Sequence, residues 1–164
     1  MKRAVFPGSF DPFTVGHMDI LQRACALFDE VIVCVIPNPA KKPMFSAGER
    51  MDMIGRAAKA AGLCNVRCDS YCGLTVDYAR REGAAFLIRG LRTPEDFAFE
   101  SGLDSYNRML APDVQTVYMA ALPAHIHISS SAVRQLIGYN ADIGPLVPKE
   151  ISEFIAERLI GDEQ

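Results

Sequence analysis

Short apolar runs alternate with amphipathic stretches along the whole chain, a pattern typical of strands and helices that follow one another. The clearest run, Val31–Ile36, is unbroken, as expected for a parallel strand whose two faces are both buried. Proline and asparagine end that run, and a basic loop follows it. Shorter runs predict further strands at Arg3–Phe6, Val66–Asp69, Phe86–Ile88 and Val114–Met119.

Helices are expected between these strands and after the last of them. Thr93 is a capping residue, Pro94 suits a first helical position, and the acidic residues that follow favour the positive end of a helix dipole. In the last predicted helix, Ile151 and Ile155 belong to one apolar stripe. The predicted helices are His17–Phe28, Ala47–Ala61, Thr75–Glu82, Pro94 to about Leu110, Ser130–Gly138, and a final helix that opens at Pro148.

This alternation predicts an α/β fold: a Rossmann-like, doubly wound parallel sheet of about five strands with helices on both faces. The chain has 164 residues and contains no repeat, low-complexity segment or linker, so one domain over residues 1–164 is expected. In such folds ligands bind outside the carboxyl ends of the strands. The loops that lead from strands into helices are therefore the places to look for chemistry.

The net charge of −3 narrows the class of ligand. A broad nucleic-acid surface normally needs a basic excess, so no nucleic-acid partner is expected. A small anionic ligand remains possible, because a pocket needs only a few local cations.

The expected compartment is the cytoplasm, and no membrane association is expected. Met1-Lys2-Arg3 leads into a strand-like run and not into the apolar region of a signal peptide, and no apolar stretch approaches the ~20 residues of a membrane span. The five cysteines, an odd number, suggest free thiols in a reducing compartment. The even spacing of Cys64, Cys68 and Cys72 matches no zinc or iron–sulfur pattern.

The loop after the first predicted strand reads Pro-Gly-Ser-Phe-Asp-Pro-Phe-Thr-Val-Gly-His, from residue 7 to residue 17. Gly8 and Gly16 allow the backbone to come close to a ligand, and Ser9 offers a hydroxyl and an amide N–H. His17 falls at a helix N-terminus, where unpaired amides and the helix dipole favour phosphate. A loop rich in glycine and proline is often only a turn, but a Gly-His pair directly after this one indicates a phosphate site.

A run of serines opens a late helix, in the segment Ile128-Ser129-Ser130-Ser131-Ala132-Val133-Arg134. Hydroxyls at a helix start can cap the backbone, and they can also donate to phosphate oxygens. Taken alone, the run is explained by capping.

Basic residues follow two of the predicted strands. Arg89 and Arg92 come directly after a buried strand, where the planar guanidinium fork suits a phosphate. Lys41 and Lys42 lie in the basic loop after Val31–Ile36. A lone Lys-Lys pair is usually a solvated loop, so the pair indicates a site only together with the other segments.

These four segments together resemble the phosphopantetheine adenylyltransferase family of the nucleotidyltransferase superfamily. That family reads P-G-(S/T)-F-D-P-x-T-x-G-H, then K-K-P-x-F, I-R-G-(L/I)-R and I-S-S-S. The resemblance runs from Lys2 to about Leu159. Thr14 stands where the related H-x-G-H form has its first histidine, and Phe99 stands where an aromatic hydroxyl is often found.

The resemblance implies a single nucleotidyltransferase domain that transfers an adenylyl group from ATP to 4′-phosphopantetheine, giving dephospho-coenzyme A and pyrophosphate in coenzyme A biosynthesis. His17 is the expected catalytic residue, as a donor to the α-phosphate. The residues expected to bind the acceptor are Ser9, Lys41, Thr75 and Arg89. The residues expected to bind ATP are Ser9, Phe10, His17, Gly90, Leu91, Arg92, Glu100, His125, Ile126, His127, Ile128, Ser129, Ser130 and Ser131.

The resemblance also implies Mg²⁺ bound with the ATP, held more by phosphates and water than by a protein cage, and a homohexamer. A zinc site at His17, His125 and His127 would lack a carboxylate or thiol to complete it. Of His125 and His127, which alternate on an extended loop, only one is expected to face the nucleotide.

Two alternative functions remain open. A sister enzyme would act on nicotinamide mononucleotide or would transfer a cytidylyl group to glycerol phosphate. A nucleotide sensor would bind without turnover. Lys41 and Arg89 argue against the sister enzyme, because they imply a phosphorylated acceptor and match the two acceptor anchors of the phosphopantetheine adenylyltransferase family. His17 and Lys41 argue against the sensor, because a sensor has no need of an acceptor-side lysine.

Overall fold

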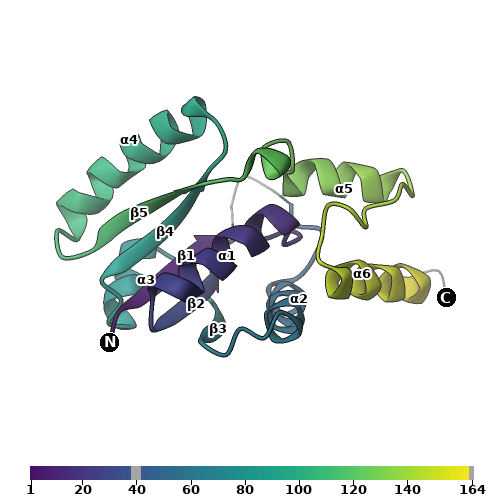
Figure 1. Ribbon diagram of the computed structural model, residues 1–164, viewed down its shortest axis with the longest axis horizontal. Helices are drawn as coiled ribbons and strands as arrows, with labels where there is room; N and C mark the ends of the chain where they lie inside the picture. Colours follow the sequence, from purple (N-terminus) through teal and green to yellow (C-terminus); the bar gives the residue numbers. More distant parts are fainter. Residues whose placement is uncertain (38–41, 163–164) are drawn as a thin grey trace.

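In a computed structural model the chain forms one five-stranded sheet with helices packed around it (Figure 1). The structure describes residues 1–37 and 42–162. The strands are β1 (Arg3–Gly8), β2 (Glu30–Val35), β3 (Val66–Ser70), β4 (Phe86–Leu91) and β5 (Gln115–Ala120). The helices are α1 (Val15–Leu27), α2 (Ala47–Ala60), α3 (Thr75–Arg81), α4 (Pro94–Leu110), α5 (Ser130–Gly138) and α6 (Lys149–Asp162), with a short 3₁₀ turn, η1, at Pro123–His125.

The strand order is β3-β2-β1-β4-β5, and every neighbouring pair is parallel. This confirms the predicted doubly wound α/β fold. The order reverses between β1 and β4, which follow one another in space but not in sequence. At such a switch point the loops after the two strands diverge and leave a crevice at the carboxyl edge of the sheet.

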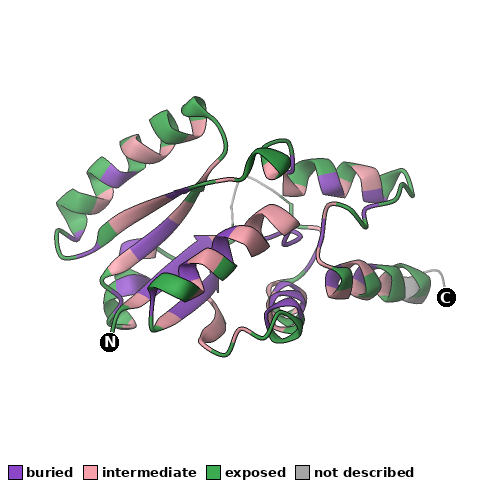
Figure 2. Ribbon diagram, in the orientation of Figure 1, coloured by how far each residue is buried: buried purple, intermediate pink, exposed green. Residues whose placement is uncertain are grey.

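Two apolar cores, one on each face of the sheet, follow from the two-residue period of the strands. In β2, Val31, Val33 and Val35 face one core, which α1 and α2 cover. Ile32 and Cys34, between them, face the second core, which contains α3. Because both faces of β2 are buried, its sequence shows no polar alternation (Figure 2).

The later helices extend the fold away from the sheet. α6 packs against α2, where Arg56 lies over the ring of Phe154 at 5.2 Å and Arg158 pairs with Glu49. α4 lies beside β4 and β5 at the opposite end of the molecule (Figure 1). Within residues 1–37 and 42–162, no helix is long and apolar enough to cross a membrane.

Candidate active site

A cleft of about 650 Å³ opens at the switch point, above the carboxyl ends of β1 and β4. It is bounded by the β1–α1 loop, the end of β4 with the first turns of α4, and the start of α5. Three of the sequence motifs therefore meet at one place. The predicted site residues that line the cleft are Ser9, Phe10, His17, Arg89, Gly90, Arg92, Glu100, His125, Ile128, Ser129, Ser130 and Ser131.

The β1–α1 loop turns sharply where β1 ends. Phe10 is buried and has a φ of 48°, a left-handed conformation that is uncommon for a residue with a side chain. Its ring folds back over Gly8, so that a Cβ at residue 8 would lie 2.7 Å from the ring. Phe10 also packs edge-on against the His17 ring, with centroids 5.1 Å apart. Gly8 thus makes room for the ring that supports the histidine.

Gly8→Ala is expected to displace the Phe10 ring and to destabilise the protein by about 1–3 kcal/mol, the usual cost of overpacking. Turnover should fall as well, because the displaced ring supports His17. Gly55→Ala is the matched control: residue 55 lies inside α2 with no atom near its Cβ position, so alanine should stabilise the helix by up to about 1 kcal/mol. Chemical denaturation measures both changes. Equal stability of the two variants would contradict the packing argument.

His17 belongs to the capping box that starts α1. Its amide donates to the Thr14 hydroxyl oxygen at 3.4 Å, and the Thr14 amide donates back to His17 Nδ1 at 3.0 Å. Because Nδ1 accepts this bond, the neutral ring carries its proton on Nε2. Thr14 therefore selects the tautomer that can donate a hydrogen bond from Nε2.

The environment of His17 keeps its ring neutral. Burial, and to a smaller extent the positive charge of Arg92, together lower the pKa of the imidazole from 6.5 to about 4. At neutral pH the side chain is therefore a hydrogen-bond donor without a positive charge. Such a donor suits an oxygen on which negative charge develops.

Arg89 and Glu100 form an ion pair on the β4–α4 side of the cleft. Arg89 Nε donates to Glu100 Oε2 at 2.7 Å, and a second guanidinium nitrogen contacts the other carboxylate oxygen. A third nitrogen of Arg89 donates to the Pro7 carbonyl oxygen at 3.1 Å. Arg89 was predicted to bind the acceptor and Glu100 to bind ATP; in the structure, the Glu100 carboxylate orients the Arg89 guanidinium.

Arg92, which directly follows β4, reaches towards the serines at the start of α5, where its guanidinium lies 3.5 Å from the Ile128 carbonyl oxygen. Arg92 is held by Asp96, through its amide at 3.0 Å and its Nε at 3.1 Å. Ser129 caps α5 by accepting from the Ala132 amide at 3.2 Å, and the Ser130 hydroxyl donates to the Pro12 carbonyl at 2.8 Å. The serine run thus serves as a cap and also presents the N-terminus of α5 to the cleft, where amides and dipole favour an anion.

Some predicted residues do not line the cleft. Thr75 starts α3, after β3, which is the edge strand farthest from β4. Ile126 and His127 are exposed, because η1 turns the chain after His125, whereas His125 lines the cleft. The remaining positions are Leu91, the last residue of β4, which is not among the lining residues, and Lys41, which lies outside the described residues. Roles for these positions stay predictions.

Four charged side chains that were not predicted as site residues also line the cleft: Asp11, Arg50, Asp96 and Arg134. Asp11 and Arg50 are each 4% exposed. Asp11 and Arg134 lie inside two of the motifs, so the sequence could have identified them as candidate site residues. Arg50, within α2, carries no such signal, since an arginine in a helix is ordinarily exposed.

The described part of the chain contains no group of three or more His, Cys, Asp or Glu side chains placed to hold a metal ion.

Comparison with known proteins places this geometry in a family. A family described as cytidylyltransferase-like matches residues 5–136. The phosphopantetheine adenylyltransferase of Clavibacter michiganensis subsp. michiganensis is 46% identical over 160 residues, covering 96% of this chain and 98% of that protein. The enzyme of the same name from Clostridium perfringens is 45% identical over 160 residues, covering 98% of this chain and 96% of that protein.

The fold also resembles that of solved structures with little sequence similarity. A bifunctional NMN adenylyltransferase/ADP ribose pyrophosphatase from Francisella tularensis has a TM-score of 0.75 at 17% identity, covering 97% of this chain and 50% of that one. Identity this low supports a shared fold. The two enzymes from Clavibacter michiganensis and Clostridium perfringens, in contrast, share 45–46% identity with this chain along nearly its whole length.

Proposed function

Because this chain belongs to the phosphopantetheine adenylyltransferase family, we propose that it transfers an adenylyl group from ATP to 4′-phosphopantetheine, giving dephospho-coenzyme A and pyrophosphate. The observation that carries the proposal is the identity to relatives of that name along 96% or more of the chain. The cleft supports it, since most of the residues expected to bind the two substrates line this one cavity.

The proposed reaction makes little use of general acid–base catalysis. An oxygen of the acceptor phosphate attacks the α-phosphorus of ATP, and the bond from that phosphorus to the bridging oxygen of the pyrophosphate breaks. The nucleophile is already an anion, so no base is required to generate it. The barrier lies in aligning two polyanions while charge shifts onto the α-phosphoryl oxygens and the leaving group.

The residues of the cleft suit that task. His17, neutral and with its proton on Nε2, would donate to an α-phosphoryl oxygen as charge develops there. The N-terminus of α5 and Arg92 would hold the triphosphate. Ser9, at the junction of the two walls, would contact both substrates. These are positioning and electrostatic contributions, which in such enzymes supply most of the rate enhancement.

The acceptor would bind on the side of the cleft that Arg89 marks. Its guanidinium is oriented by Glu100, and a guanidinium fork suits a phosphate. Lys41 would add a second positive charge, and Thr75 would contact the pantetheine arm. Two cations from different loops favour an acceptor that carries a phosphate over one that does not.

Magnesium would enter with the ATP. Its chemical contribution is to neutralise charge on the phosphate oxygens.

An assembly of identical subunits, a homohexamer by family resemblance, would account for the outer face of α4. Phe99, Leu103, Tyr106 and Leu110 are all exposed and repeat at helical spacing. Much of α4 is coloured as exposed in Figure 2. Exposed apolar stripes of this kind usually mark an interaction surface. Light scattering coupled to gel filtration tests the assembly, and Leu103→Glu should shift it to smaller species. A monomeric wild-type protein would overturn this part of the proposal.

The five free thiols agree with a reducing compartment such as the cytoplasm.

The experiment that tests the activity is a pyrophosphate-release assay with ATP and a panel of acceptors. We expect release with 4′-phosphopantetheine and none with nicotinamide mononucleotide. The same assay with CTP and glycerol phosphate tests the cytidylyl alternative. Release with one of the other acceptors alone would identify a sister enzyme, and binding of ATP without release under any condition would identify a sensor.

A further inference from the structure

Asp11 fixes the segment that follows the basic loop. Its Oδ1 accepts from the Phe45 amide at 3.0 Å, and its Oδ2 accepts from the Met44 amide at 3.0 Å. Pro43, the residue before these, lines the cleft. A buried carboxylate that accepts two backbone amides holds that backbone in place, because each amide would otherwise lose a strong hydrogen bond.

Asp11 is also held by α5, whose N-terminus is proposed to bind the nucleotide. Arg134, in α5, donates to the Asp11 carbonyl oxygen, and its guanidinium lies 3.6 Å from the Asp11 carboxylate. Residue 12 is tied to α5 as well, through the hydrogen bond from Ser130. Asp11 therefore lies between the serine-rich wall and the segment that contains Met44.

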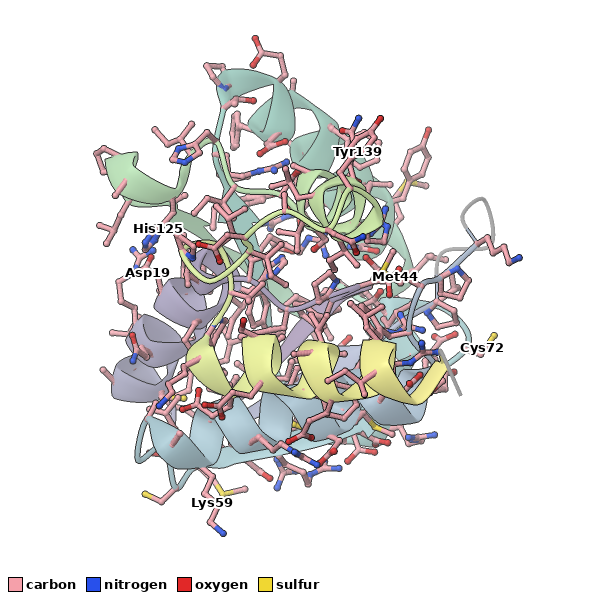
Figure 3. All side chains as sticks on the ribbon, turned by 90° about the vertical axis from the view of Figure 1, so that its right-hand side faces the viewer. Asp19, Met44, Lys59, Cys72, His125 and Tyr139 are labelled. Atoms are coloured by element: carbon pink, nitrogen blue, oxygen red, sulfur yellow. The ribbon has the colours of Figure 1, made fainter. Side chains whose placement is uncertain are left out.

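Arg50 makes a second link between the β1–α1 loop and that segment. Its guanidinium donates to the Ser9 carbonyl at 2.7 Å and to the Ser46 carbonyl at 3.2 Å. Figure 3 shows that the segment and the nucleotide wall are separate places, since Met44 lies well apart from His125. The β1–α1 loop is thus bonded both to the segment that contains Met44 and to α5, and it connects these two walls of the cleft.

We propose that Asp11 is a positioning residue for the reaction: by holding the Met44 and Phe45 amides it sets the acceptor-side wall of the cleft at a fixed distance from α5. The proposal rests on the proposed function for the identity of the acceptor. Asp11 does not need to touch either substrate. Its effect on catalysis comes through alignment of the attacking phosphate, and small misplacements of a nucleophile are costly.

Two measurements test this. The first is amide hydrogen exchange of Met44 and Phe45 in the wild-type protein without substrates; we expect slow exchange, which Asp11→Asn should accelerate by at least about tenfold. The second is steady-state kinetics. For Asp11→Asn, we expect KM for 4′-phosphopantetheine to rise about tenfold and kcat to fall about tenfold, with the Kd for ATP changed by less than about twofold.

Asp104→Asn is the matched control. Asp104 is also a buried aspartate with two donors, Thr116 Oγ1 and Arg108 Nε, but it lies in α4 and does not line the cleft. It should lower thermal stability and leave the kinetic constants near those of the wild type. A similar KM increase in both variants would indicate general destabilisation and would overturn the proposal.

The remaining outcomes are also decisive. Rapid exchange of both amides in the wild type, or a folded Asp11→Asn protein with unchanged acceptor KM, would overturn it. If Asp11→Asn does not fold, Met44→Pro removes one of the two donors and should give a smaller increase in acceptor KM; no increase would overturn the proposal. If the wild type shows no turnover with this acceptor, the proposed function fails, while the exchange measurement still reports on the Asp11 contacts.

Discussion

Replacing His17 with alanine is expected to lower kcat by on the order of 10²–10³-fold, the usual loss when one donor to a developing oxyanion is removed. The Kd for ATP should change by less than about threefold, because the hydrogen bond from Nε2 strengthens only as charge grows on the α-phosphoryl oxygens. Accordingly, kcat and kcat/KM should fall together. Single-turnover rates and direct ATP binding would measure the two effects separately.

His17→Gln serves as the chemical control. The glutamine amide is a neutral donor that can reach close to the position of Nε2, so it should recover part of the lost rate. If the histidine acted as a proton carrier, glutamine would be as inactive as alanine. Near-normal turnover of the alanine variant would remove His17 from the mechanism.

The lowered pKa of His17 predicts a pH dependence of stability. In the folded protein this pKa is about 4, against 6.5 for the free side chain, so between these values the unfolded chain binds more protons. The stabilisation is complete above pH 6.5 and is lost as pH falls through that window towards 4. His17→Asn, which cannot titrate, should have a shallower decline in unfolding free energy between pH 6.5 and 4. Parallel declines for the two proteins would contradict the assignment.

Replacing Arg89 with alanine should weaken binding of 4′-phosphopantetheine by about ten- to a hundredfold, since a charge-assisted hydrogen bond contributes roughly 1.5–3 kcal/mol. ATP binding should be nearly intact. The protein should also lose stability, because the Glu100 side chain is only 13% exposed and would be left without its bidentate partner. Calorimetry with each substrate separately, together with a thermal melt, measures all three effects.

Arg92→Ala is the comparison for Arg89, because Arg92 lies towards the serine-rich wall and should affect ATP binding instead. Arg89→Lys should recover little, since an ammonium cannot replace the planar fork that Glu100 orients. From the sequence, Lys41→Ala should resemble Arg89→Ala, and Lys42→Ala should be milder. Unchanged acceptor affinity in the Arg89 and Lys41 variants would place the acceptor elsewhere and would favour a sister enzyme.

The succession of strands and helices along the chain and the class of fold could both be predicted from the sequence. Val31–Ile36 was identifiable as a buried strand because burial on two faces removes polar alternation. Thr93 and Pro94 marked the start of α4 because capping is a local property, and the observed helix begins at Pro94. The motif around His17 indicated a phosphate site for the same reason: a glycine-rich turn and a helix N-terminus are both formed by neighbouring residues.

The contacts between side chains that are distant in the sequence became known only from the folded structure. It paired Arg89 with Glu100 and placed His125, but not His127, on the cleft. It also brought Asp11 to Met44 and buried Arg50 against the β1–α1 loop. The physical reason is that hydrophobic period and capping act within a few residues, whereas a buried ion pair or a carboxylate on a distant amide depends on how the loops pack after the sheet has formed. Sequence patterns therefore predict the local interactions directly, whereas the contacts between distant residues form only in the folded chain.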